Sequence, residues 1–196
     1  MYKKLLVPLT LIFVLMLSAC GGGFKPDHKY KVDSFEFTNQ NNETVTDEDL
    51  KGSIWLAQFV FTKCTTVCPP MMSNMVTLQE KLIDNNIEDY NIVSFSVDPD
   101  VDTPEELAKY LDMFSAPDES KWQMLTGYDM KTIEKIAASS FKQLVKQIPN
   151  DDQVIHGVSF GLVNQNNEVV KLYGGNEDVD YDTIVKDIKA LIKEGK

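Results

Sequence analysis

Two cysteines and one histidine are the residues of this chain best suited to soft-metal or redox chemistry. Cys64 and Cys68 lie in FTKCTTVCPP, directly after the apolar run SIWLAQFVF, and His156 stands much later in VIHGVSF. Two thiolates and an imidazole favour copper or zinc over calcium or magnesium. The thiol pair can also form a disulfide, although the rigid spacing of a C-x-x-C redox motif is absent.

The ligand count favours copper over zinc. A closed structural zinc site usually has four ligands, and the other cysteine and histidine of the chain, Cys20 and His28, lie in the polar segment that precedes the expected domain. Copper(I) accepts two or three ligands, and copper(II) can add water or another oxygen. The alternative for His156 is a partly buried loop histidine that is satisfied by hydrogen bonds.

Other residues are candidates for supporting roles. Cys68 precedes Pro69, which suits the first turn of a helix, so we expect the helix dipole to lower the pKa of Cys68. Asp98 follows a predicted strand, and we expect it to hold a proton or orient His156, although an aspartate before proline also begins turns. Asp102, beside a helix cap, is a weaker candidate. Met71 could add a thioether ligand, but methionines at helical spacing are usually core residues.

The N-terminus is typical of an exported lipoprotein. Two lysines precede an uncharged run, Leu5 to Leu17, which is shorter than the roughly 20 apolar residues of a membrane span. LSAC then resembles the lipoprotein box, whose cysteine is lipidated. We expect residues 1–19 to be a signal peptide, residues 20–31 a tether attached to the membrane through a lipid on Cys20, and residues 32–196 one domain. This places the domain on the outer face of the bacterial cytoplasmic membrane.

Composition excludes one class of partner. The chain has no arginine, and its 19 lysines face 30 acidic residues, which gives a net charge of −11. Nucleic-acid binding needs a basic face, so we expect no nucleic-acid partner. A monomer is expected.

Alternating strand and helix patterns predict an α/β domain with a mainly parallel central sheet flanked by helices. An N-terminal β-hairpin is expected within 35–46. Strands are expected at 53–61, 91–97, 122–125, 158–163 and 169–173, and helices from Pro69, after the Thr103 capping box, over 129–139 and at the C-terminus. His156 is expected in a loop beside an interior strand. Because functional groups gather where the strands of such sheets end, the cysteine loop and His156 should meet there.

The motifs FTKCTTVCPP, VSFSVDPDVDTPEEL and VIHGVSF, in this order, resemble the Sco (SenC-type) family. The resemblance runs from about Val32 to the C-terminus. It implies a thioredoxin-like fold, copper(I) or copper(II) bound by Cys64, Cys68 and His156, and a role in assembling the binuclear copper centre of cytochrome c oxidase subunit II. Many family members read C-P-D-V-C-P, whereas this chain has Thr65-Thr66, so its loop is less stiff and lacks a nearby carboxylate.

Two other functions use the same residues. A thiol–disulfide oxidoreductase outside the cytoplasm would use Cys64 and Cys68 as a redox pair that reduces the cysteines of a partner, with His156 tuning the thiolate. A peroxide-reducing enzyme is less well supported, because its cysteine usually has an arginine nearby and this chain has none. The sequence thus favours a copper carrier over an enzyme, with thiol–disulfide exchange as the alternative.

Overall fold

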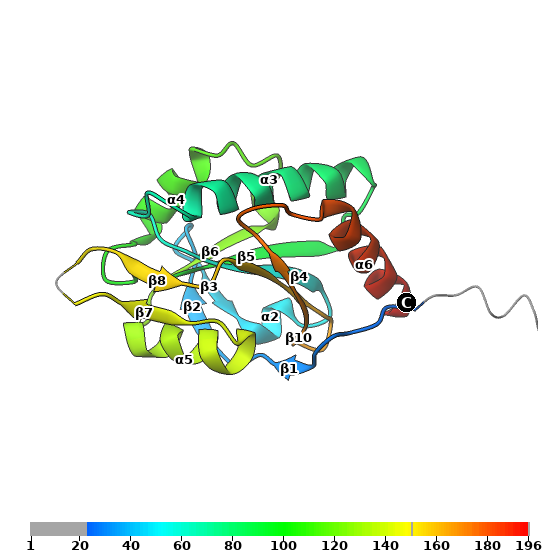
Figure 1. Cartoon of the computed structure of the whole chain (residues 1–196), viewed down its shortest axis with the longest axis horizontal. Coiled ribbons are helices and arrows are strands. Elements are labelled where there is room, and N and C mark those ends of the chain that lie inside the picture. The colour runs from blue at the N-terminus through cyan, green and yellow to red at the C-terminus, as the bar shows by residue number, and fades with distance from the viewer. Residues whose placement is uncertain (1–22, 150, 196) are drawn as a thin grey trace, which may run out of the picture.

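The strands and helices predicted from the sequence are present, with small shifts at their ends. The computed structural model describes residues 23–149 and 151–195 (Figure 1). The strands are β1 (Tyr30–Lys31), β2 (Glu36–Thr38), β3 (Thr44–Thr46), β4 (Ile54–Val60), β5 (Tyr90–Ser96), β6 (Trp122–Leu125), β7 (Val145–Gln147), β8 (Val154–His156), β9 (Ser159–Val163) and β10 (Glu168–Gly174). The helices are α2 (Asp47–Leu50), α3 (Cys68–Asp84), α4 (Pro104–Asp112), the 3₁₀ helix η2 (Glu119–Lys121), α5 (Met130–Phe141) and α6 (Tyr181–Glu194).

The central sheet is mixed and not mainly parallel as expected. Its six strands follow the order β1-β10-β9-β4-β5-β6. The pairs β4–β5 and β5–β6 are parallel, whereas β9 runs antiparallel to both β4 and β10. β1 adds a further antiparallel pair at the edge. The difference arises because the final hairpin, β9–β10, joins the sheet through β9 beside β4.

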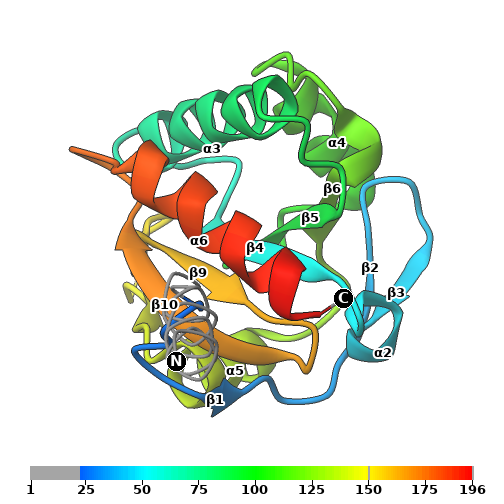
Figure 2. The same cartoon turned by 90° about the vertical axis from the view of Figure 1, so that its right-hand side faces the viewer.

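Alternate residues of β4 face two different helical layers, as the pleat of a strand requires. Trp55 and Phe59 face α5, where the ring of Phe141 lies edge-on to each of them, with centroid distances of 6.1 and 5.4 Å. Gln58 faces the other layer, where its Nε2 donates to Met72 Sδ of α3 at 3.2 Å. α6 lies beside α3 in that layer (Figure 2). Every residue of β4 is buried, which explains its continuous apolar run.

The β7–β8 hairpin was not predicted from the sequence, and it changes the placement of His156. Val145 pairs with His156, and Gln147 pairs with Val154, in a two-stranded sheet separate from the central one. This hairpin extends to one side of the molecule (Figure 1). His156 is therefore the last residue of a strand, and the loop placement expected from the sequence is wrong.

The described part of the expected tether, 23–31, packs against the domain. The backbone N–H groups of Asp27 and His28 donate to the Val170 carbonyl, and Tyr30 pairs with Val169. His28 stacks on Tyr30, with ring centroids 4.9 Å apart. The packed region thus extends N-terminal to the expected boundary at Val32. Cys20 and the expected signal peptide lie outside the described residues, and no helix within 23–149 and 151–195 has both the length and the apolar character to cross a membrane.

Candidate metal and thiol site

The end of β4 and the start of α3 bring the two cysteines together. Between these elements the chain turns over residues 61–67, and the Cys64 N–H donates to the Phe61 carbonyl at 3.2 Å. Cys68 is the first residue of α3, and two prolines follow it. Proline suits this position because the first N–H groups of a helix have no partner within the helix. The Cys68 N–H instead donates to Cys64 Sγ at 3.3 Å.

His156 approaches the cysteines from the β7–β8 hairpin. Its Nε2 lies 3.1 Å from Cys68 Sγ, and its Nδ1 lies 2.9 Å from the Gly157 carbonyl oxygen. The ring lies edge-on to Phe61, with centroids 5.8 Å apart. A carbonyl can only accept a hydrogen bond, so in the neutral ring Nδ1 carries the proton. The lone pair of Nε2 therefore faces the sulfur of Cys68, so Nε2 and this sulfur could bind the same metal ion.

The three side chains form a small, soft ligand set. The sulfurs of Cys64 and Cys68 and a ring nitrogen of His156 all lie within 4.8 Å of one another. All three residues are buried, with exposed fractions of 6%, 0% and 9%. Two sulfurs and one imidazole nitrogen suit copper or zinc. The structure thus brings together the three residues that the sequence predicted to meet.

Ionisation differs sharply between the two cysteines. The pKa of Cys64 is lowered well below its ordinary value, chiefly because the Cys68 thiol donates to the Cys64 sulfur and also because backbone N–H groups donate to it. The pKa of Cys68 is raised by its hydrogen bond to Cys64, by burial and by the negative charge of Cys64. The expectation of a lowered pKa at Cys68 is therefore wrong. The helix N-terminus acts on the neighbouring sulfur, because the Cys68 N–H points at Cys64.

Asp98 makes no hydrogen bond to His156, whose two ring nitrogens lie against Cys68 Sγ and the Gly157 carbonyl oxygen. Asp98 is buried, and burial together with the nearby Asp102 raises its pKa. Its expected role stays a prediction. Met71 is fully buried in the hydrophobic core, as its helical spacing indicated.

Asp102, the weaker of the two aspartate candidates in the sequence, binds the cysteine loop directly. It is fully buried and accepts hydrogen bonds from the Thr62 N–H at 3.2 Å, from Thr62 Oγ1 at 2.6 Å and from Ser96 Oγ at 2.6 Å. These contacts fix the first residues of the cysteine loop to the end of β5. The segment VDPDVDTP includes Asp102, but no pattern in it indicates that this aspartate is buried. Its position beside Thr103, which does cap α4, suggested an exposed residue at a helix start.

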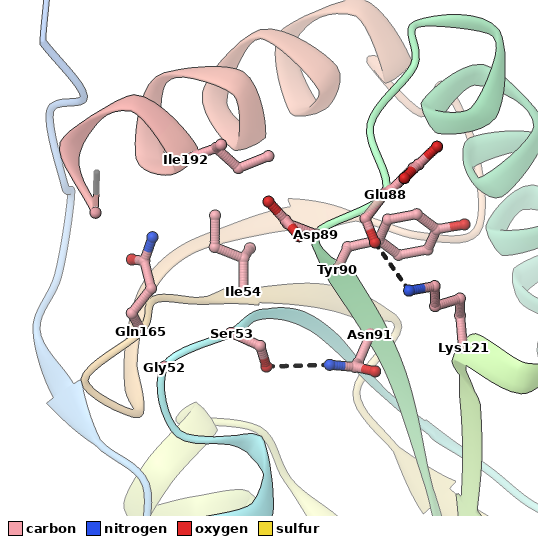
Figure 3. A pocket seen from close by; sticks show the side chains of 11 residues that line it. Gly52, Ser53, Ile54, Glu88, Asp89, Tyr90, Asn91, Lys121, Gln165 and Ile192 are labelled. Atoms are coloured by element: carbon pink, nitrogen blue, oxygen red, sulfur yellow. Dashed lines mark hydrogen bonds between the residues drawn. The ribbon is translucent and has the colours of Figure 1, made fainter.

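A cavity of about 340 Å³ lies at the opposite end of β4, and Figure 3 shows its lining. Two of its polar side chains have partners within the protein: Asn91 Nδ2 donates to Ser53 Oγ, and Lys121 Nζ donates to the Glu88 carbonyl. Within the described part of the chain, no cysteine or histidine lines this cavity, so it offers no soft ligand for a metal ion.

Comparisons with known proteins identify the family of this chain. The SCO1/SenC family model matches residues 25–193. The SCO1 protein homolog of Bacillus subtilis is 46% identical over 181 residues, which cover 92% of each chain.

Solved structures of Sco proteins are similar to this chain as well. A structure of BsSco, described as a member of the Sco family of cytochrome c oxidase assembly proteins with a disulfide switch, is 45% identical. It superposes with a TM-score of 0.79 over 86% of this chain and 97% of that one. Copper-bound ScoI of Arabidopsis thaliana is 28% identical, with a TM-score of 0.68 over 80% and 97% of the two chains. These matches confirm the thioredoxin-like fold, and the chain belongs to the SCO1/SenC family.

Proposed function

We propose that this protein binds one copper ion through Cys64, Cys68 and His156 and takes part in cytochrome c oxidase assembly. The observation that carries the proposal is the convergence of two sulfurs and one imidazole nitrogen within 4.8 Å, from three different elements of the fold. A copper-bound relative and a relative described as an oxidase assembly protein support it. The finer proposal is delivery of copper to the binuclear centre of subunit II.

The donor set supports copper as the ion. Among the described residues, the group that holds Cys64, Cys68 and His156 contains no fourth cysteine, histidine or carboxylate. A three-ligand site matches copper(I), whereas structural zinc usually has four protein ligands. Three protein ligands also leave the ion open to a ligand from an acceptor protein, which transfer requires.

We place the protein on the outer face of the cytoplasmic membrane, attached as a monomer through a lipid on Cys20. The support is the sequence LSAC after a short apolar run, since Cys20 lies outside the described residues. A single acyl chain binds membranes weakly, so stable attachment would need more than one chain.

Anaerobic copper titration of the reduced and disulfide forms tests the proposal. One copper should bind per reduced domain, and the disulfide form should bind none, because a disulfide removes both thiolate ligands. Saturating copper should raise the melting temperature of the reduced protein by mass action. Cys64→Ser and Cys68→Ser should each abolish most of this rise. An unchanged melting temperature in reduced wild-type protein would refute copper binding.

Thiol–disulfide exchange is the second candidate function. The stabilised thiolate at Cys64 is the state that attacks a disulfide, and BsSco carries a disulfide switch. His156→Ala separates the two functions, because exchange needs only the two sulfurs. We expect this variant to lose stable copper(II) binding and its charge-transfer colour while it still forms the Cys64–Cys68 disulfide.

The decisive measurement is oxidase activity at low copper in cells that carry His156→Ala. His28→Ala is the matched control, because His28 stacks on Tyr30 and is not part of the ligand group. A copper carrier should fail with His156→Ala and work with His28→Ala. Normal oxidase assembly in both strains would favour the reductase.

A further inference from the structure

Gly157 follows His156 and has no room for a side chain. A Cβ atom built on Gly157 would lie 2.1 Å from Gln143 Oε1, 2.8 Å from Gln143 Cδ and 2.9 Å from Gln143 Cβ. Rotation about the Cα–Cβ and Cβ–Cγ bonds of Gln143 could relieve the first two contacts. It cannot relieve the third, because the Cβ position is set by the backbone. Glycine is therefore required here by the packing of Gln143.

Gln143 is held firmly in place. It is buried, its backbone N–H donates to the Ala137 carbonyl at 2.9 Å, and its Nε2 donates to the Ser159 carbonyl at 3.3 Å. It follows Lys142, whose backbone is left-handed with a φ of 54° and ends α5. Within the described residues Gln143 Oε1 has no hydrogen-bond partner. The amide is therefore held by its packing on Gly157 and by the bond from Nε2 to the Ser159 carbonyl.

Gly157 is held through both of its backbone groups. Its N–H donates to the Leu144 carbonyl at 3.0 Å, and its carbonyl accepts from His156 Nδ1 at 2.9 Å. A shift of Gly157 therefore moves the acceptor that keeps the proton on Nδ1. The proton would then be free to move to Nε2, the nitrogen that faces Cys68.

We propose that Gln143 is a positioning residue that, packed on Gly157, holds the His156 ring with Nδ1 protonated and Nε2 available to a metal ion. The inference about the ring stands on the metal-free geometry, while its consequence for copper rests on the proposed function. Groups that orient a ligating histidine through its other nitrogen typically change metal affinity about 10–100-fold when they are removed.

The test uses Gly157→Ala, Gln143→Gly and the double variant. In each single variant we expect copper(II) affinity to fall about 10–100-fold. We also expect nitrogen NMR of the reduced, metal-free protein to show loss of the single Nδ1–H tautomer of His156. In the double variant the new methyl group enters space that the glutamine has left, so affinity and tautomer should partly recover, with strong non-additivity.

Two controls separate this packing effect from general loosening. Gly174→Ala adds a methyl group whose nearest neighbour is the Glu177 carbonyl at 3.7 Å, so it should change neither readout. Gln147→Gly removes an exposed glutamine from β7 of the same hairpin and should keep wild-type affinity.

Single variants that keep both the Nδ1–H tautomer and wild-type affinity would overturn the proposal. Additive losses in the double variant would overturn it as well, because they would show that the two residues do not act through one contact. If wild-type protein bound no copper, the proposed function would fail, yet the tautomer comparison would still decide the role of Gln143.

Discussion

Removal of the Asp102 carboxylate should destabilise the protein and loosen the cysteine loop. Three donors converge on this fully buried side chain: the Thr62 N–H, the Thr62 hydroxyl and the Ser96 hydroxyl. Asp102→Ala leaves all three without their acceptor. A buried donor without a partner costs about 1–3 kcal/mol.

The burial of the carboxylate offsets part of this cost, since burial raises the pKa of Asp102 and therefore disfavours its charged form. We expect a net loss of about 3–5 kcal/mol in the free energy of unfolding. For a domain of this size that corresponds to a drop of roughly 10 °C in melting temperature. Asp102→Asn keeps the volume and one acceptor oxygen, so it should lose only about 1–2 kcal/mol.

Urea unfolding and thermal melts of the reduced, metal-free protein measure these losses, and copper titration then reports on the loop. Asp98→Ala is the matched control, because Asp98 is also buried but its carboxylate makes no hydrogen bond to another described residue. A loss of less than about 1 kcal/mol in Asp102→Ala, or an equal loss in Asp98→Ala, would show that these hydrogen bonds do not stabilise the fold.

Two further predictions concern pH and a partly buried ion pair. Because folding lowers the pKa of Cys64 below its ordinary value of 9.0, the unfolded chain binds a proton that the folded protein lacks. The stability of the reduced protein relative to Cys64→Ser should therefore rise between pH 5 and pH 8 and shrink as pH falls, and a difference in melting temperature that is independent of pH would contradict this. Asp187 accepts from Lys171 Nζ and from Tyr173 Oη at 2.8 Å each, and the ionic side chains are mostly buried. Asp187→Ala should cost about 2 kcal/mol in urea unfolding, less than a fully buried pair because some solvent reaches it, and 1 M salt should leave most of this loss in place.

Local patterns in the sequence predicted most of the elements and the three ligand candidates. The proline pair after Cys68 and the Thr103 cap fixed two helix starts, and both appear in the structure. Alternation and turn residues also located the final hairpin, β9–β10. Its antiparallel place beside β4 could not be predicted, because that pairing depends on contacts between segments about 100 residues apart, which no local pattern records.

The β7–β8 hairpin escaped prediction because its strands have three residues each. VKQ and VIH are too short to show alternation, although Pro149 and the aspartates after it do indicate a turn. The sequence also could not show that the lowered pKa belongs to Cys64 and not to Cys68. Sequence places Cys68 at a helix N-terminus, but only coordinates show that its N–H points at the other sulfur.

The first described residues and the cysteine loop lie at opposite ends of β4. The Phe24 N–H donates to Glu194 near the end of α6, beside the start of β4, whereas the cysteine loop follows the far end of that strand (Figure 1). Seven residues of strand, at about 3.3 Å each, separate the two ends by roughly 20 Å. If Cys20 carries the proposed lipid, the ligands would lie at the end of β4 that is farther from the attached end of the chain. An acceptor protein would then have to present its own metal ligands at that distance from the membrane.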